Sequence, residues 1–362
     1  MKFTVLGGGH GAHTMTAELS MVGHEVNLYE LPRFVENIAA AKILGKIKLS
    51  VRDPYGEEYV GPAGGETGAV EIRGKVTTDI REAVKGVDVI NVVVPAFGQR
   101  SFMEEFLPHL EDGQIVIFHP GNFGSLECRN LMREKGIDKD VIVAETECLI
   151  YACRVVGPAA AWLFNFKREV LLSALPARDT GKVLKVINQV YPQFVAADNV
   201  LYTSMNNVNT VLHTASTILN ASRIEQLGAY KCSHYDVTPS VGRVMDELDK
   251  ERMDVQKALG LKPISTKDVL HRYYGAKGRN MYEVLVDCVT YKVQTSPKDL
   301  KTRYITEDVP YSLVPISSIG DSLGVSTPTM KALIQVASVM NQTDYWREGR
   351  TVDKLGLTSL SA

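Results

Sequence analysis

The chain has 362 residues, which at roughly 150 residues per domain predicts two domains and excludes a miniprotein. With 40 Lys and Arg against 42 Asp and Glu, its formal net charge of −2 gives no basic surplus for nucleic acid or an anionic membrane. Hydrophobic residues make up 45% and charged residues 23%, as in globular proteins, which argues against disorder as a main feature.

Short β-branched runs alternate with amphipathic stretches in the first half, which predicts βαβ units and a doubly wound parallel sheet, a Rossmann-type α/β fold. Most of the predicted strands are continuous apolar runs, typical of strands buried on both faces: Phe3–Leu6, Glu25–Tyr29, Val87–Val94, Gln114–Phe118, Val141–Ala144 and Val170–Ala174. The predicted helices are Ala12–Val22, Phe34–Leu44, Ser101–Leu110, Leu126–Lys135 and Thr180–Val190. Between Lys46 and Lys75, the glycine-rich segment Gly61-Pro62-Ala63-Gly64-Gly65 indicates turns between short antiparallel strands.

After about residue 198 the apolar runs lengthen and follow a helical period, which predicts an all-α second domain. We place the boundary between 198 and 199, because Tyr191-Pro192 ends the preceding helix. The predicted helices of this domain are Val208–Ile224, Val241–Leu259, Thr266–Gly275, Met281–Val293 and Thr327–Gln342.

A glycine-rich loop follows the first predicted strand and opens the first helix, in the pattern Gly7-x-Gly9-x-x-Ala12. Such a loop allows a tight turn, a close backbone approach to a pyrophosphate and close helix–strand packing, while the helix N-terminus offers free N–H groups. The second strand ends in Glu30, about 20 residues on, where a ribose-binding acid is expected. The spacing predicts a dinucleotide site formed by Gly7, Gly9, His10, Gly11, Ala12 and Glu30.

The residues around this loop favour NAD as the cofactor. The Glu30 carboxylate would accept hydrogen bonds from the ribose hydroxyls and repel a 2′-phosphate. Arg33, three residues later, could instead cover such a phosphate, so NADP stays open. Pro95 and Ala96 end a predicted strand and are expected to line the cofactor site, unless they form an ordinary strand-to-helix turn.

A nicotinamide enzyme needs a proton donor or acceptor beside the hydride path, and histidine suits this work near neutral pH. Among eight histidines, His213 stands out because Asn209, four residues earlier, shares its helix face. A buried histidine that is merely hydrogen-bonded to a neighbour is the alternative. Asp308 precedes an apolar Val-Pro stretch and could orient an imidazole, but the residues alone do not separate it from Glu307.

Over nearly its whole length the sequence resembles the opine dehydrogenases, also called the octopine/nopaline dehydrogenase family. The resemblance rests on the Gly7–Ala12 loop, Val94-Pro95-Ala96, His119–Gly124, Ala144-Glu145-Thr146, Asn209…His213 with Leu219-Asn220-Ala221, and Arg303–Pro310. It implies a Rossmann-type domain, a helical domain and, in the cleft between them, an active site with a His–Asp pair, here His213 and Asp308. Relatives often have proline directly after the histidine, whereas this chain has Thr214.

The resemblance also implies a reaction. A 2-oxo acid, commonly pyruvate, condenses with the amino group of an L-amino acid, and NAD(P)H reduces the imine to a secondary amine dicarboxylate. His213 would exchange the protons, with Asp308 holding its tautomer. Asn209, Arg154 and Arg303 are candidates for binding the substrates, although either arginine would equally suit a surface or structural ion pair.

Two other classes of function stay open. The first is a simple 2-oxo acid or hydroxyacid reductase, similar to ketopantoate reductase or glycerol-3-phosphate dehydrogenase. Those enzymes usually use a lysine near the start of the helical domain, and this chain has no lysine between Leu201 and Arg223. The second is a regulator that senses NAD(H) without turnover, because a Rossmann fold alone does not establish catalysis.

Cysteines and apolar segments indicate the compartment. The five cysteines form no C-x-x-C pair, so we expect buried thiols, no metal site and a reducing environment. The longest apolar run, Val87–Phe97, is too short to cross a bilayer, and the N-terminus has no secretory apolar region. These features predict a cytoplasmic protein without a membrane or nucleic acid partner; the apolar faces of its helical domain leave a homodimer open.

Overall fold

The computed structural model describes residues 1–51, 67–232, 234–293 and 295–357. It divides into two compact units, Met1–Thr203 and Ser204–Ala362. The boundary thus lies five residues after the one drawn from the sequence. The glycine-rich segment Gly61–Gly65 lies outside the described residues, so the turns expected there are not described.

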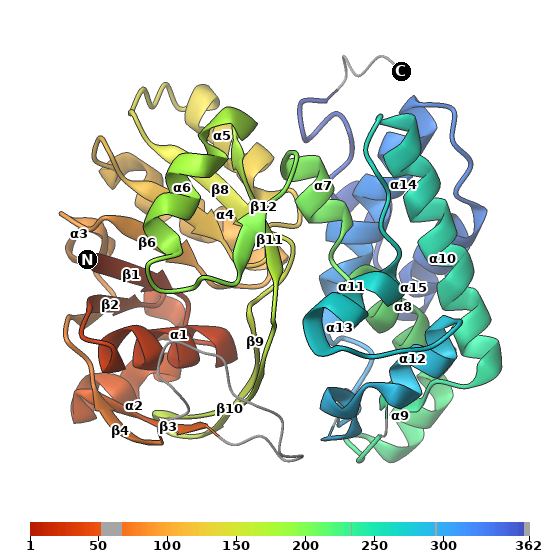
Figure 1. Cartoon of the computed structure of the whole chain (residues 1–362), viewed down its shortest axis with the longest axis horizontal. Helices are drawn as coiled ribbons and strands as arrows, with labels where there is room; N and C mark the ends of the chain where they lie inside the picture. Colours follow the sequence, from red (N-terminus) through yellow and green to blue (C-terminus); the bar gives the residue numbers. More distant parts are fainter. Residues whose placement is uncertain (52–66, 233, 294, 358–362) are drawn as a thin grey trace. The chain divides into compact units, whose positions relative to one another are not determined.

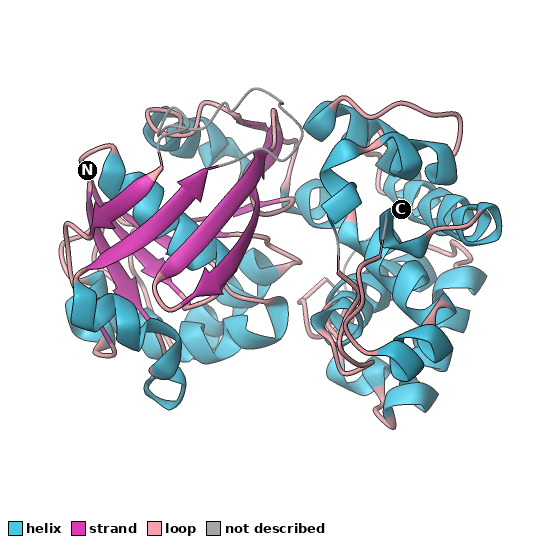
Figure 2. Ribbon diagram, turned by 90° about the horizontal axis from the view of Figure 1, so that it is seen from below, coloured by secondary structure: helices cyan, strands magenta, loops and turns pink. Residues whose placement is uncertain are grey.

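The first unit is built on an eight-stranded sheet (Figures 1 and 2). In spatial order its strands are β12 (Phe194–Ala196), β11 (Val170–Leu175), β8 (Ile142–Thr146), β7 (Ile115–Phe118), β6 (Val89–Val92), β1 (Lys2–Leu6), β2 (Glu25–Tyr29) and β5 (Val76–Thr77). Every pair is parallel except β11 with β8. The predicted Rossmann-type sheet is therefore confirmed, with one antiparallel junction that the sequence did not predict.

The antiparallel junction follows from the connection between β8 and β11. A parallel return needs a crossover, usually a helix. Here the hairpin β9 (Tyr151–Gly157) and β10 (Ala160–Phe166) intervenes instead, and the chain re-enters the sheet in the opposite direction. The hairpin joins β3 (Lys46–Val51) and β4 (Gly68–Glu71) in a second sheet, ordered β4-β3-β10-β9.

Helices connect the strands of the first unit, as the alternating pattern predicts. They are α1 (His10–Met21), α2 (Glu36–Leu44), α3 (Ile80–Val84), α4 (Ala96–Phe106), α5 (Gly124–Glu134) and α6 (Thr180–Ile187). Helix α4 begins five residues before the predicted start, because Pro95 takes the extended conformation of an N-cap. The short helix α3, capped by the Asp79 side chain, was not predicted.

Strand register brings three loops to one edge of the large sheet. Leu6 pairs with Tyr29 on one side and with Val92 on the other, so β1, β2 and β6 end at the same level. The chain order also reverses here, because β1 continues to β2 on one side while β6 lies on the other. In open parallel sheets this reversal is where ligands bind.

The second unit is helical, and every strand named in the described part of the chain precedes residue 197 (Figure 2). Its helices are α8 (Asn209–Leu219), α9 (Ala221–Leu227), α10 (Pro239–Ala258), α11 (Thr266–Tyr274), α12 (Met281–Asp287), α13 (Arg303–Thr306), α14 (Val314–Ser322), α15 (Pro328–Asn341) and α16 (Tyr345–Glu348). Helix α7 (Val200–Met205) spans the division between the units. The single helix predicted over Val208–Ile224 is wrong, because Asn220 leaves the helical conformation and separates α8 from α9.

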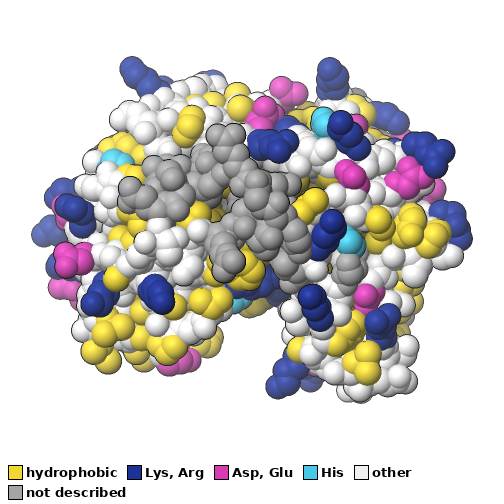
Figure 3. All heavy atoms as spheres, turned by 60° about the horizontal axis from the view of Figure 1, so that its bottom comes forward, with side chains coloured by type: hydrophobic (Ala, Val, Ile, Leu, Met, Phe, Trp, Pro, Cys, Tyr) yellow, Lys and Arg dark blue, Asp and Glu magenta, His cyan; other side chains and the backbone are white. Residues whose placement is uncertain are grey.

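Three expectations drawn from the composition concern the cysteines, the surface charge and membrane-spanning helices. The five cysteines are buried as thiols. On the face drawn in Figure 3, charged side chains of both signs are scattered over the surface. No helix in the described ranges is both long and apolar enough to span a membrane.

Candidate active site

Three of the four glycines in the glycine-rich loop, Gly7, Gly9 and Gly11, meet different structural requirements. Gly7 has φ +118°, and a Cβ there would lie 2.6 Å from the Val93 carbonyl oxygen, so only glycine fits. A Cβ on Gly11 would lie 2.7 Å from the Leu149 side chain, so this residue allows close packing of α1. A Cβ on Gly9 would meet nothing within 4 Å. The backbone thus requires glycine at Gly7, close packing favours it at Gly11, and Gly9 borders open space at the N-terminus of α1.

This geometry fits a dinucleotide. Gly9 is the N-cap of α1, whose first amides lack intrahelical partners and favour an anion. Ala12 is fully buried and packs the helix close to the sheet. His10 is held elsewhere, because its Nδ1 accepts a hydrogen bond of 2.8 Å from the Val155 amide of β9. We therefore expect the backbone of this loop, more than the His10 ring, to contact a pyrophosphate.

Glu30 follows β2 and is 4% exposed. Its Oε1 accepts from the Leu31 amide at 2.8 Å and its Oε2 from Asn37 at 3.1 Å, which fixes the carboxylate. Burial raises the pKa of this carboxyl group above its usual value. Arg33 donates to the Ser101 hydroxyl at 3.1 Å, so its guanidinium is already engaged. The Glu30 carboxylate, expected at the ribose hydroxyls, is thus held by two hydrogen bonds, whereas Arg33, expected at a 2′-phosphate, already bonds Ser101.

The loop after β6 completes this edge. Pro95 is the N-cap of α4, and Ala96, its first residue, is 1% exposed. Val93 reaches the glycine loop through its backbone, since its amide donates to the Leu6 carbonyl at 2.9 Å. The structure thus brings the loops of Gly7, Glu30 and Pro95 to the same sheet edge.

Removing the charge of Glu30 should relax the choice of cofactor. In Glu30→Gln the repulsion of a 2′-phosphate disappears while the side-chain size is kept, so the ratio of kcat/KM for NADH to that for NADPH should fall about 10-fold or more. The measurement is initial rate against each cofactor, with Glu36→Gln on the exposed face of α2 as a control. An unchanged ratio would mean that Glu30 does not face the ribose.

The second unit holds a buried histidine–carboxylate pair. His213 on α8 and Asp308, just after α13, lie 2.8 Å apart from Nδ1 to Oδ2. Their side chains are 3% and 1% exposed, although 95 residues separate them in the sequence. A π-helical turn, Val309–Leu313, begins directly after Asp308 and leads into α14. An ionised carboxylate only accepts hydrogen bonds, so when Asp308 is ionised His213 carries its proton on Nδ1, and Nε2 is the nitrogen that can exchange a proton with a substrate.

The structure also separates Asp308 from Glu307. Glu307 faces Arg303, with 3.0 Å between its Oε2 and Nη1 of the arginine. Burial raises the pKa of the Asp308 carboxyl to about 7, while the positive charge of Arg303 opposes this rise. The pair therefore sits where a proton is readily exchanged near neutral pH.

Two tyrosines surround the imidazole. The Tyr304 ring stacks on the His213 ring with 3.7 Å between centroids and 13° between planes. The Tyr235 ring lies 5.8 Å from the imidazole at a tilt of 58°. An aromatic face stabilises a nearby cation, so Tyr304 favours the protonated imidazole. Tyr304 was part of the recognised motif, but neither tyrosine was predicted as a site residue, because their approach to α8 depends on tertiary packing.

Replacing Tyr304 should change the pH dependence of turnover. In the reductive direction we expect His213 to donate a proton. Tyr304→Leu removes about 0.5–2 kcal/mol of stabilisation from the imidazolium, so the basic limb should move about 0.4 to 1.5 pH units lower. Tyr304→Phe keeps the ring and should leave the limb in place. The measurement is kcat/KM from pH 5 to 10; equal profiles for all three proteins would exclude this electrostatic role.

Other histidines in the described chain fit acid–base work less well. His119 is buried beside Asn91, with 3.1 Å from Nε2 to Oδ1, and burial lowers its pKa to about 3. Burial also lowers the pKa values of His13 and His24. His213, by contrast, faces the carboxylate of Asp308 at hydrogen-bond distance.

The predicted substrate ligands are divided between the units. Asn209, part-exposed, begins α8 one turn before His213. Arg303, on α13, is 44% exposed at its side chain and lies over the Tyr304 ring at 5.5 Å. Arg154, on β9 of the first unit, donates to the Cys153 carbonyl at 3.0 Å. Asn209 thus lies on the same helix as His213, and Arg303 lies on the helix that precedes Asp308.

Asn206 and Asn207, which precede α8, take part in hydrogen bonds that hold the fold together. Arg252, 1% exposed, donates from Nη1 to the Asn206 side chain at 2.7 Å and pairs with Asp249 at 2.7 Å. Asn207 accepts from the Asn209 amide at 3.0 Å. These bonds fix the turn into α8 and so orient His213, a network that the sequence analysis did not predict.

Comparison with known proteins agrees with this geometry. A family model described as NAD/NADP octopine/nopaline dehydrogenase, alpha-helical domain, matches residues 196–341. An opine dehydrogenase of Arthrobacter sp. (strain 1C) is 34% identical over 361 residues, 99% of this chain and 96% of that protein. Octopine dehydrogenase of Pecten maximus is 24% identical, over 98% and 94% of the two chains. A structure of octopine dehydrogenase with NADH and L-arginine shares the fold, with a TM-score of 0.79 at 21% identity over 100% and 99% of the chains.

Proposed function

The chain belongs to the octopine/nopaline dehydrogenase family, and we propose that it catalyses an NAD(P)H-dependent reductive condensation. A 2-oxo acid, pyruvate in the first instance, joins the amino group of an L-amino acid to give a secondary amine dicarboxylate, and the reverse reaction cleaves it oxidatively. The observation that carries the proposal is the buried pair of His213 and Asp308, 2.8 Å apart. NADH is the expected cofactor and NADPH the alternative, because Glu30 is fixed at the end of β2.

The reaction needs proton transfers that this pair can supply. The amine must first lose its proton to attack the ketone, and the resulting carbinolamine then loses its hydroxyl as water, which requires a proton. Nε2 of His213 takes the first proton and returns one to the departing hydroxyl. Asp308 holds the opposite nitrogen and stabilises the charged imidazole between the two transfers. A dinucleotide whose pyrophosphate is held by the glycine loop would supply, from its nicotinamide, the hydride that reduces the imine carbon.

Two substrate carboxylates must also be oriented. Arg303 presents a part-exposed guanidinium next to the ring that covers His213, and a planar guanidinium binds a carboxylate through two hydrogen bonds. Asn209 offers an amide on the histidine face of α8. We assign these two residues, together with Arg154, to carboxylate binding.

The decisive experiment measures NADH and, separately, NADPH oxidation with pyruvate plus a panel of L-amino acids. Controls contain pyruvate alone and pyruvate with ammonium. Oxidation that requires both organic substrates would support the condensation. Oxidation by the keto acid alone would place the protein with the simple reductases, and cofactor binding without turnover of any pair would favour an NAD(H)-sensing protein.

We further propose a homodimer formed through the helical unit. Helix α15 exposes Val336 and Val339, whose side chains gain by being covered. Light scattering at several concentrations tests this. We also propose a cytoplasmic location, since the five cysteines are buried as thiols, as expected in a reducing compartment.

A further inference from the structure

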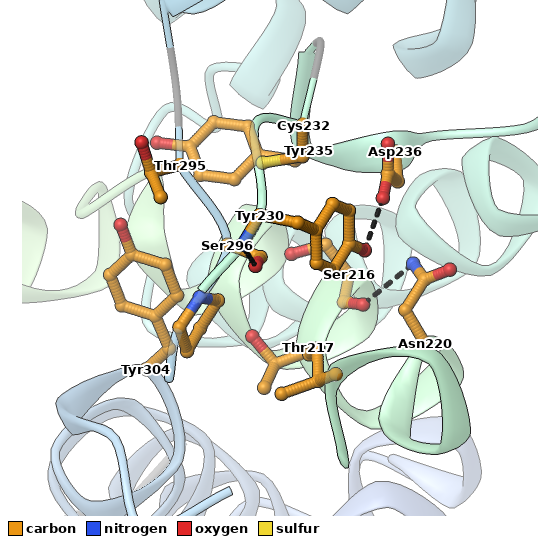
Figure 4. Close-up of a pocket in the computed structure, with 12 residues that line it drawn as sticks. Ser216, Thr217, Asn220, Tyr230, Cys232, Tyr235, Asp236, Thr295, Ser296 and Tyr304 are labelled. Atoms are coloured by element: carbon orange, nitrogen blue, oxygen red, sulfur yellow. Dashed lines mark hydrogen bonds between the residues drawn. The ribbon is translucent and has the colours of Figure 1, made fainter. Parts of the chain in front are cut away.

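A pocket in the second unit lies next to the histidine–carboxylate pair (Figure 4). Ser216 and Thr217 of α8 and its C-cap Asn220 line it. They follow His213 by three, four and seven residues, so they lie on its side of the helix. Its other walls are Ile224, Tyr230, Cys232, Tyr235, Asp236, Thr295, Ser296, Pro297 and Tyr304. Tyr235 and Tyr304 also contact the His213 ring. The pocket and the surroundings of the imidazole therefore share the side chains of Tyr235 and Tyr304.

We propose that this pocket receives the side chain of the amino acid donor and selects an uncharged one. The inference rests on the proposed function and names the donor class that the sequence left undetermined. Nothing in the catalytic pair itself distinguishes one donor from another, because every donor presents the same amino group and carboxylate.

Distance supports this assignment. One turn of α-helix rises about 5.4 Å, so Ser216 and Thr217 lie about one turn beyond His213. The donor nitrogen has to stand beside the imidazole, and its Cα and first side-chain atoms then span a comparable length. A side chain leaving that Cα toward Thr217 enters the pocket past Tyr304, whose ring forms a wall of both sites.

The described lining of the pocket carries one charged side chain, the carboxylate of Asp236, and its balancing cation lies outside the lining. The other lining residues bring hydroxyls, phenols, one amide and apolar groups, and burial raises the pKa of the Cys232 thiol to about 11, which keeps it neutral. Asp236 is the one carboxylate among the lining residues that the structure describes. It accepts a hydrogen bond from the Tyr230 hydroxyl and faces Nε of Arg223 at 3.4 Å.

Arg223 therefore neutralises the pocket from outside. It belongs to α9, is 54% exposed at its side chain, and its guanidinium lies 4.8 Å from the Tyr230 ring centre. An anionic donor side chain would approach Asp236 and be repelled. A cationic one would have to displace Arg223 from both the carboxylate and the ring, whereas an uncharged side chain displaces neither.

The first test is the donor profile of the wild-type protein. With pyruvate and NADH, we expect kcat/KM for L-valine and L-threonine to exceed that for L-glutamate and L-arginine by at least about 10-fold, which is about 1.4 kcal/mol. A preference for either charged donor would overturn the proposal.

The second test changes the charge of the pocket without touching its lining. Arg223→Gln frees Asp236, so kcat/KM for L-arginine and L-lysine should rise at least fivefold while the value for L-valine stays within twofold. The matched control is Arg243→Gln on α10, which removes the same charge from a residue outside the pocket. An equal response of charged and uncharged donors, or of both variants, would contradict the assignment.

The third test fills or enlarges the pocket. Thr217→Met should raise KM for L-valine more than for L-alanine, with the Kd of NADH unchanged; Asn220→Ala, which removes bulk, should favour L-leucine instead. A change confined to the KM of pyruvate would assign the pocket to the keto acid and refute the donor role. Saturation-transfer NMR of L-valine with the NADH-bound protein reports occupancy without turnover. Binding that Thr217→Met abolishes would thus support the pocket even if the condensation assay failed, and binding that it leaves intact would refute it.

Discussion

Asp308→Asn should lower kcat by about 10²- to 10⁴-fold while the Kd of NADH changes less than twofold. Asparagine keeps the shape of the side chain but has no negative charge to stabilise the imidazolium, and its NH₂ group can select the wrong tautomer of His213. The cofactor loop lies in the other unit, at Gly7–Ala12, so its contacts do not involve this side chain. The effect should therefore fall on the chemical steps and not on cofactor binding.

Steady-state rates and NADH fluorescence titration measure the two quantities on the same preparation. Asp321→Asn, which alters an exposed ion pair with Lys331, is the control and should leave kcat within twofold. Turnover of Asp308→Asn equal to that of the wild type would remove Asp308 from the mechanism. A parallel loss of NADH binding would show a structural defect instead.

The difference in stability between the wild type and Asp308→Asn should depend on pH. Burial raises the pKa of Asp308 from about 4 in the unfolded chain to about 7 in the fold, so the fold disfavours the ionised carboxyl. The Asp308 carboxyl therefore loses its proton at a lower pH in the unfolded chain than in the folded protein. As pH rises from about 4 to 7, the free energy of unfolding of the wild type should fall relative to that of Asp308→Asn. Thermal unfolding of both proteins across this range measures the difference, which should be constant if the carboxyl were not buried.

The sequence predicted the first unit well because its signals are local. Continuous apolar runs matched β1, β2, β6, β7, β8 and β11 to within three residues at either end. The hairpin β9–β10 was missed, since its strands alternate buried and part-exposed residues and pair with the distant strand β3. The direction of β11 was also missed, because it depends on that hairpin.

For the site too, the residues placed by local chain geometry were predicted from their spacing in the sequence, and those brought together by tertiary packing were not. The glycine spacing and Glu30 follow from local chain geometry and stand together at one sheet edge. The pairing of His213 with Asp308 came from the family resemblance, because residues 95 positions apart carry no local sign of contact. The stacking of Tyr304 and the neutralisation of Asp236 by Arg223 arise only when α8, α9 and α13 are packed, so no spacing in the sequence indicated them.

Gly9→Val should raise the Kd of NADH by about 100-fold or more while the protein stays folded. The backbone at Gly9 has φ −85° and ψ −169°, which any residue adopts, and a side chain there would meet no protein atom within 4 Å. Loss of a good N-cap residue should cost about 1 kcal/mol, or about 2–4 °C in Tm. Nothing in the fold itself therefore requires glycine at this position, and a large loss of binding would have to come from the ligand.

Gly7→Ala gives the opposite pattern and makes the comparison decisive. At φ +118°, with a Cβ 2.6 Å from the Val93 carbonyl, alanine strains the backbone and displaces the loop after β6. Its Tm should fall well below that of Gly9→Val, with or without NADH. The two variants separate a glycine that the fold needs from one that the pyrophosphate needs. If Gly9→Val bound NADH as the wild type does, the dinucleotide would not cross the N-terminus of α1, and the cofactor would have to bind elsewhere on the sheet edge.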